Sequence, residues 1–139
     1  MPETHVEELT TDAQWDAAVP VLGQLWNEKT PAEIRSWRDE EGYRLFGLSV
    51  DEEVVAVAGV SIQRVLHHAR HAWIHDLVVD EAHRREGYGE TLLAAVDDWA
   101  RERDCEYVAL ALIEGNDEAG QFYCEQGMKR WGDVIEKPL

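Results

Sequence analysis

A short segment rich in arginine and glycine carries the clearest chemical signal in this chain. It reads Arg84-Arg85-Glu86-Gly87-Tyr88-Gly89, and the apolar run before it ends with Leu77, Val78 and Val79. A strand, a glycine-containing turn and a helix start in this order present several backbone N–H groups to one anion, because those amides have no partners inside the helix. Glycine lets the backbone approach such a ligand, since a Cβ would intrude on it. The segment therefore predicts a binding site for a pyrophosphate of the nucleotide type.

Two common phosphate-binding patterns do not fit this segment. A dinucleotide-binding Rossmann unit needs a third glycine and an acidic residue some twenty positions further on, within one βαβ unit. A P-loop needs Gly-Lys followed by Ser or Thr, and the segment contains no lysine. The ligand has to be identified from the surrounding residues.

The elements around the segment can be predicted from apolar spacing, caps and breakers. Thr11-Asp12-Ala13-Gln14 and Thr30-Pro31-Ala32-Glu33 are typical helix starts, and Pro20 should kink the first helix or split it in two. We expect strands at 5–9, 43–50, 54–61, 71–79, 105–113 and 128–135, and further helices at 87–103 and 116–126. The strand at 105–113 is apolar on both faces, as in a buried central strand. The order β-α-α-β-β-β-α-β-α-β predicts one α/β domain, residues 1–139, with helices on the faces of a mixed sheet.

Length and composition narrow the class of protein. The chain has 139 residues, 45% of them apolar, which suits a single domain with a buried core. It has no apolar run of the ~20 residues that a membrane span requires and no signal-peptide pattern, so we expect a cytoplasmic protein without a membrane partner. Cys105 and Cys124 lack the number and spacing of a disulfide framework, and we expect free thiols.

The net charge is strongly negative. Twenty-nine acidic residues stand against thirteen basic ones, which gives a formal net charge of −16. Such a field disfavours binding to nucleic acid or anionic lipid. It is compatible with attraction of a cationic substrate or with adaptation to molar salt, in which charge repulsion is screened over a few ångströms. The acidic residues are spread along the whole chain, which favours the second interpretation.

Four histidines lie close together in the sequence: His67, His68, His71 and His75. Residues 71 and 75 can face one side of a strand, but no three-ligand set with supporting partners follows from the spacing. We expect no metal site.

A second motif follows the first at a definite distance. The first can be written Arg84-x-x-Gly87-x-Gly89, and the second Asn116-x-x-Ala119-x-x-Phe122-Tyr123-x-x-x-Gly127-Met128. In this order and spacing, over about residues 70–130, the chain resembles the GCN5-related N-acetyltransferases (the GNAT family). The resemblance implies the GNAT-type fold, a mixed and mostly antiparallel central sheet with helices on both faces.

The resemblance also implies acetyl-CoA as the cosubstrate and assigns residues to it. The backbone amides of Arg85 to Gly89 would hold the pyrophosphate, with Arg84 at the start of the turn. Leu77, Val78 and Val79 would present their backbone to the pantetheine arm. Asn116 would contact the pantetheine, and Tyr123 would lie near the sulfur.

The implied reaction is direct attack of a primary amine on the thioester. It needs proximity, a deprotonated amine and a proton for the departing thiolate. Tyr123 is the candidate general acid, with a merely packed aromatic ring as the alternative. For the general base we rank His75 first, then Asp76, then Glu114. A proton route through water, without a single base, remains open.

Two further points concern the base and the turn. Neighbours on a strand face opposite sides, so at most one of His75 and Asp76 should point into the site. The ~6.5 pKa of an unperturbed imidazole suits proton uptake near neutrality. Glu86 and Glu90 put carboxylates where relatives often carry basic or small residues, which should weaken cofactor binding at low salt.

The sequence leaves the acceptor and some alternatives open. The acceptor is expected to be a small-molecule or peptide amine, and Trp26, Trp37 and Trp131 are either its walls or core residues. A non-catalytic acyl-CoA-binding or sensing module is the second interpretation. A toxin that acts on aminoacyl-tRNA would need a basic face that this composition lacks. A homodimer is compatible with the sequence but has no signature in it.

Overall fold

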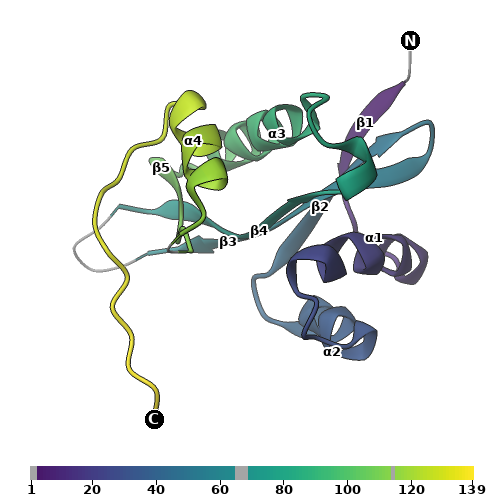
Figure 1. The fold of residues 1–139 in the computed structure, drawn as a ribbon, viewed down its shortest axis with the longest axis horizontal. Helices are drawn as coiled ribbons and strands as arrows, with labels where there is room; N and C mark the ends of the chain where they lie inside the picture. Colours follow the sequence, from purple (N-terminus) through teal and green to yellow (C-terminus); the bar gives the residue numbers. More distant parts are fainter. Residues whose placement is uncertain (1–2, 65–68, 114) are drawn as a thin grey trace. The chain divides into compact units, whose positions relative to one another are not determined.

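The computed structural model describes residues 3–64, 69–113 and 115–139. The chain forms two compact units, residues 1–109 and 110–139. Figure 1 shows the elements of both units in sequence colours.

The N-terminal unit is built on an ordered sheet. Its strands follow one another in space as they do in sequence, in the order β1-β2-β3-β4-β5, and the pairs β1–β2, β2–β3 and β3–β4 are antiparallel. The strands are β1 (Thr4–Glu8), β2 (Arg44–Val50), β3 (Glu53–Gln63), β4 (His71–Val79) and β5 (Tyr107–Leu110). The predicted mostly antiparallel α/β architecture is confirmed.

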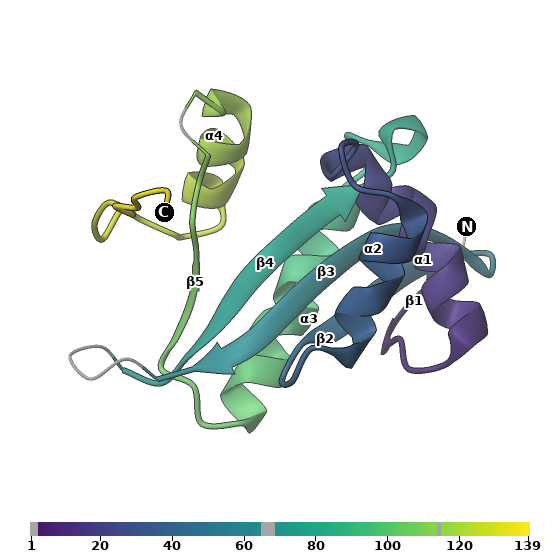
Figure 2. The same cartoon turned by 90° about the horizontal axis from the view of Figure 1, so that it is seen from below.

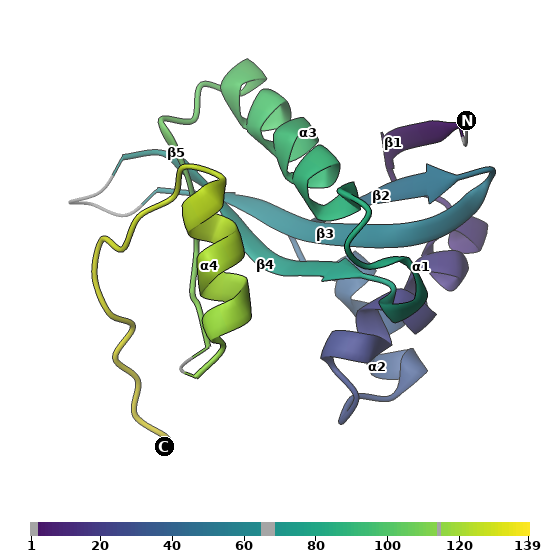
Figure 3. The same ribbon diagram turned by 45° about the horizontal axis from the view of Figure 1, so that its top comes forward.

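Helices cover both faces of this sheet. Helices α1 (Asp12–Leu25) and α2 (Pro31–Ser36) lie on one face and α3 (Tyr88–Glu102) on the other, as Figures 2 and 3 show. Short 3-10 helices, η1 (Trp37–Asp39) and η2 (Glu81–His83), follow α2 and β4. Alternate residues of a strand point to opposite faces, so β2 and β3 supply two cores. The first contains Leu22, Ile34 and Val57, and the second brings Trp99 of α3 against Phe46, with ring centroids 5.4 Å apart.

The predicted capping boxes form at the starts of α1 and α2. The Thr11 and Thr30 side chains accept from the N–H groups of Gln14 and Glu33, which satisfies amides that a helix cannot pair internally. Pro20 does not split α1, contrary to one expectation. Pro20 has no N–H group, so the carbonyl of Asp16 lacks its helical donor. Both residues are exposed, so water can replace the lost hydrogen bond.

The C-terminal unit contains one helix, α4 (Asp117–Glu125), among its described residues. The Asn116 side chain caps its start, and Gly127, at φ +88°, ends it. Met128 N–H donates to the Tyr123 carbonyl and Gly127 N–H to that of Cys124, which is a Schellman motif. The helix predicted to end at Gly127 is confirmed.

One strand prediction in the last third of the chain is wrong, and another holds over a shorter range with less burial. The described residues 128–139 form no strand, and their apolar side chains are exposed, with Ile135 at 93%. Charged residues and Gly132 interrupt this segment, so no apolar face is buried to offset the cost of ordering it. Strand β5 has four residues and is the last in the sheet order, and Tyr107 is 58% exposed. The strand expected at 105–113 is therefore present but shorter than predicted, and it is not buried on both faces.

No helix in the described ranges is long and apolar enough to cross a membrane.

Candidate functional site

A β-bulge in β4 brings two titratable side chains to the same side of the sheet. Gly59 pairs with Asp76 while Val60 pairs with Ile74, which leaves His75 as the extra residue. The ring of His75 lies 5.6 Å from that of Tyr43, and the same tyrosine hydrogen-bonds Asp76. The expectation that only one of His75 and Asp76 could face the site is therefore wrong, because the bulge interrupts strand alternation.

Asp76 is a buried carboxylate with a partner on each oxygen. The Tyr43 hydroxyl donates to Oδ2 at 2.6 Å, the Trp26 indole N–H donates to Oδ1 at 2.5 Å, and only 4% of the residue is exposed. Desolvation raises the pKa of Asp76, against the lowering effects of Tyr43, Trp26 and the His75 charge. Burial, then the Asp76 charge and hydrogen bond, raise the pKa of Tyr43 as well. With both oxygens engaged, Asp76 is poorly placed to take a proton from a substrate.

Gly59 makes room for this cluster. A Cβ at Gly59 would collide with the Tyr43 hydroxyl and come within 2.5 Å of Asp76 Oδ2. Any larger residue would push apart the two groups whose hydrogen bond satisfies the buried carboxylate.

His75 has a different environment from its neighbour. It is exposed, and its Nε2 lies 2.7 Å from the hydroxyl oxygen of Ser61 on β3. Partial burial lowers the pKa of His75, and the Asp76 charge opposes that shift. A ring that is neutral near pH 7 and reachable by solvent can accept a proton.

The turn after β4 contains two residues in an unusual backbone conformation. Arg85 and Gly87 both adopt the left-handed conformation, with φ of +68° and +82°. The Arg84 side chain turns back and donates from Nε to the carbonyl of Val79 at 3.1 Å, which ties the turn to the end of β4. The turn is thereby fixed at both ends, by the strand and by the helix that follows.

Helix α3 begins at this turn without a side-chain cap. Gly87 is its N-cap residue and has no side chain to bond the first amides. A Cβ placed on Gly87 would meet nothing within 4 Å, so no described atom crowds the turn at this point. Unpaired N–H groups, the positive end of the helix dipole and free space are what an anion requires. The side chains of Glu86 and Glu90 beside it are exposed.

The remaining predicted residues fall into three groups. Leu77 and Val79 are half-buried on β4, and Val78 is buried in the core beneath α1. Asn116 and Tyr123 belong to the C-terminal unit, where Asn116 Oδ1 accepts from the Ala119 N–H at 3.2 Å and partial burial raises the pKa of Tyr123. Three residues named as candidates, Glu114, His67 and His68, lie outside the described residues.

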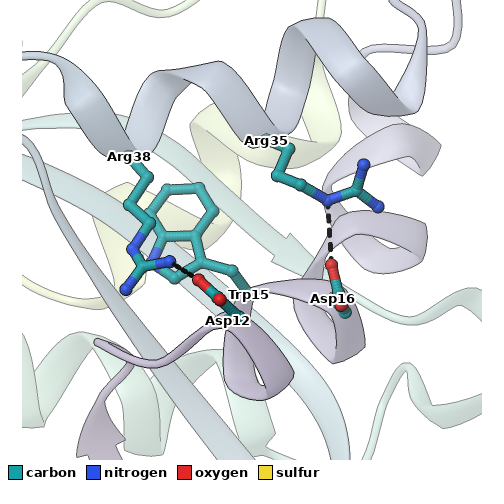
Figure 4. Close-up of a pocket in the computed structure, with 5 residues that line it drawn as sticks. All are labelled: Asp12, Trp15, Asp16, Arg35 and Arg38. Carbon is teal, nitrogen blue, oxygen red and sulfur yellow. Dashed lines mark hydrogen bonds and ion pairs between the residues drawn. The ribbon is translucent and has the colours of Figure 1, made fainter.

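A hollow of about 380 Å³ lies between α1 and α2 (Figure 4). Its charged lining residues pair with one another: Arg35 Nε with Asp16 at 2.8 Å, and Arg38 with Asp12. Pairs at an exposed site contribute about 0–1 kcal/mol each. Because its charged groups already pair with one another, the hollow is not the candidate site, and its Arg35–Asp16 pair joins α2 to α1.

Comparison with known proteins identifies the family. A sequence profile of the Acetyltransferase (GNAT) family matches residues 8–128. The uncharacterized N-acetyltransferase YhdJ of Bacillus subtilis (strain 168) is 29% identical over 142 positions, which cover 97% of this chain and 95% of that protein. The chain belongs to the GNAT family. It is therefore an acyltransferase with acetyl-CoA as cosubstrate, and the predicted family, enzyme class and cosubstrate are confirmed.

Solved structures agree with the GNAT fold. The aminoglycoside N-acetyltransferase AAC(6')-Iy, solved in complex with CoA, matches with a TM-score of 0.87 and 16% identity, over 100% of this chain and 96% of that one. An aminoglycoside acetyltransferase from an uncultured soil metagenomic sample, meta-AAC0020, solved in complex with sisomicin, matches with a TM-score of 0.81 and 17% identity, over 98% and 95%. At these identities the likeness concerns the fold alone.

Sequence reasoning missed three residues of this GNAT site. Tyr43, Gly59 and Ser61 lie outside both motifs, on or beside strands that the apolar pattern alone predicts. A signal for one of them was present, since Gly59 interrupts an otherwise β-branched and alanine-rich strand, and such a glycine often marks a bulge or a close approach.

Proposed function

We propose that this protein transfers the acetyl group of acetyl-CoA to a primary amine of a small molecule, by direct attack of the amine on the thioester. The observation that carries the proposal is the layout of β4. Its bulge holds His75 and Asp76, and its end is followed, after η2 and the turn, by the uncapped N-terminus of α3. One strand thus links proton-handling side chains to an anion site.

The turn fits the diphosphate part of the cosubstrate. The amides of Arg85, Glu86, Gly87, Tyr88 and Gly89 would donate to the pyrophosphate. Arg84 would act mainly by holding the turn, because its Nε is engaged with Val79. Bound there, acetyl-CoA supplies an activated acyl group and a thiol leaving group.

The edge of β4 beyond the bulge would take the pantetheine arm. Strand β5 has four residues against nine in β4, and Glu106 N–H at its start bonds the Arg70 carbonyl next to the start of β4. Four residues of β5 cannot cover nine residues of β4, so part of the β4 edge has no partner in β5. The backbone of Leu77, Val78 and Val79 is thus offered to an extended ligand, and one of these N–H groups can donate to the thioester oxygen.

His75 is the general base in this proposal, in preference to Asp76. Both oxygens of Asp76 are engaged and buried, whereas His75 is exposed and its pKa is lowered toward the neutral form. Tyr123 is the proposed general acid for the thiolate and Asn116 a pantetheine contact, both by their position in the second motif.

A cationic small molecule is the proposed acceptor class. The fold shared with aminoglycoside acetyltransferases supports it, and the net charge of −16 is compatible with it. A negative field attracts polyamines and repels nucleic acid. If the acidic surface served only salt tolerance, turnover would not depend on the charge of the acceptor.

The experiment is a panel of amines of rising positive charge, incubated with acetyl-CoA and read by mass spectrometry for acetylated product. Products from the cationic members support the proposal. Binding of acetyl-CoA without product from any amine would favour a non-catalytic acyl-CoA-binding module. His75→Gln tests the base, with an expected loss of about 10²-fold or more in kcat.

A further inference from the structure

Two side chains on adjacent strands form a contact that neither motif predicts. Ser61 of β3 pairs in register with Trp73, and the bulge at His75 brings the imidazole alongside the serine. The Ser61 hydroxyl oxygen lies 2.7 Å from His75 Nε2. The serine therefore contacts one specific nitrogen of the ring that the proposed reaction uses.

The surroundings of Ser61 indicate which partner donates. The side-chain amide of Gln63 donates to the Ser61 oxygen at 3.3 Å, so the hydroxyl already accepts one hydrogen bond. Its own proton needs an acceptor, and Nε2 of His75 is the acceptor within reach. The separation of 2.7 Å is compatible with donation in either direction, so the hydrogen bond from Gln63 decides which partner donates.

We propose that Ser61 relays the substrate proton to Nε2 of His75 and so sets which nitrogen of the ring accepts it. The hydroxyl donates to Nε2, so the neutral ring carries its proton on Nδ1 and its lone pair on Nε2. This inference rests on the proposed role of His75 as base.

The proton balance follows from that arrangement. The Ser61 O–H bond breaks as Nε2–H forms, and the serine oxygen takes a proton from the protonated substrate amine or from a water molecule between them. The electron pair of the broken N–H bond stays on the amine nitrogen, which can then attack the thioester. One proton has then moved from nitrogen of the amine to nitrogen of the ring, and Ser61 ends as a hydroxyl that accepts from Nε2–H. The hydrogen bond persists in both protonation states, so the ring keeps its orientation.

Other groups affect the pKa of His75 but not the choice between its two neutral tautomers. Among the described residues, the titratable groups facing His75 are Asp76 on its own strand and the Tyr43 phenol before β2. The Asp76 charge favours the imidazolium, and partial burial disfavours it. Neither group hydrogen-bonds a ring nitrogen in this structure, so the choice between Nδ1–H and Nε2–H falls to Ser61.

The direct test is ¹⁵N NMR of the histidine rings in the full-length protein, with the His75 signals assigned by their loss in His75→Gln. We expect the Nδ1–H form to dominate at neutral pH in the wild type and in Ser61→Thr, and the Nε2–H form to gain population in Ser61→Ala. Ser49→Ala, the same change on β2, should leave the His75 signals unchanged. An unchanged tautomer ratio in Ser61→Ala would overturn the proposal.

Kinetics separate this inference from the proposed function. In Ser61→Ala we expect kcat to fall at least about tenfold, which is part of the ~10²–10⁴-fold rate increase that a positioned base supplies. Both KM values should stay within about twofold of the wild-type values. The acidic limb of its pH profile should also move. An unmoved limb, in an enzyme that still needs His75, would overturn the relay role of Ser61. If His75→Gln retains full kcat, the proposed base is wrong, while the tautomer measurement still decides what Ser61 does.

Discussion

The Tyr43 hydroxyl donates a 2.6 Å hydrogen bond to a carboxylate oxygen of Asp76, across a position where only glycine, at residue 59, leaves room. The contact joins residues 33 positions apart, and with Trp26 it satisfies both oxygens of a buried acid. This arrangement stabilises the middle of β4, next to the proposed base.

Tyr43→Phe should destabilise the fold. It removes one hydrogen bond and leaves a buried carboxylate oxygen unsatisfied, at a cost of about 1–3 kcal/mol in the free energy of unfolding. Urea denaturation followed by tryptophan fluorescence measures it. Tyr43→Phe with wild-type stability would mean that water replaces the phenol and that the Asp76 cluster is not tightly packed.

The stability of the fold should depend on pH through Asp76. The folded-state pKa of Asp76 is raised above its unfolded value of about 3.9, so the folded state binds this proton more tightly. The stabilisation is complete below the unfolded pKa and is lost as pH rises through the folded pKa. Asp76→Asn removes this contribution. The difference in unfolding free energy between wild type and variant should therefore change with pH across this range, and a constant difference would contradict the shift.

Gly87→Ala should weaken acetyl-CoA binding specifically. Gly42 provides a matched control, since the two glycines have φ of +82° and +81° and neither has an atom within 4 Å of an added Cβ. Both changes should cost about 1–2 kcal/mol of backbone strain. Only Gly87→Ala should raise the Kd in calorimetric titration, because only residue 87 adjoins the proposed pyrophosphate. Equal effects of the two variants on Kd would remove the turn from the cofactor site.

The double variant Glu86→Gln, Glu90→Gln should bind acetyl-CoA more tightly than the wild type at low salt. Both carboxylates are exposed beside the anion site, and the repulsion should disappear near 1 M salt, where the Debye length is about 3 Å. Titrations from low to molar salt measure the difference. Glu102→Gln, at the opposite end of α3, is the control, and a gain of similar size there would indicate a general charge effect.

Tyr123→Phe should lower turnover far more than affinity. The phenol is the proposed proton donor to the departing thiolate, and its ring remains in the variant to pack as before. Steady-state kcat and the Kd of acetyl-CoA, measured together, check this. Equal turnover in both proteins would leave Tyr123 with a packing role only.

Local patterns predicted much of the site. The glycine turn, the start of α3 and both capping boxes depend on residues within a few positions of each other, and they form as expected. The bulge at His75 does not depend on nearby residues alone, because the register between β3 and β4 is set by pairing across the sheet. For the same reason alternation gave the wrong answer for His75 and Asp76. The strand expected at 128–135 failed because period-two spacing forms a strand only where an apolar face is buried.

The central claim is that acetyl transfer to an amine depends on the turn after β4. The most direct measurement is amine-dependent release of the coenzyme A thiol by wild type, Gly87→Trp and Gly42→Trp, at low and at molar salt. We predict release by the wild type and by Gly42→Trp, and loss of release with Gly87→Trp together with loss of acetyl-CoA binding. Undiminished release with Gly87→Trp, or no binding of acetyl-CoA by the wild type at any salt concentration, would contradict the account.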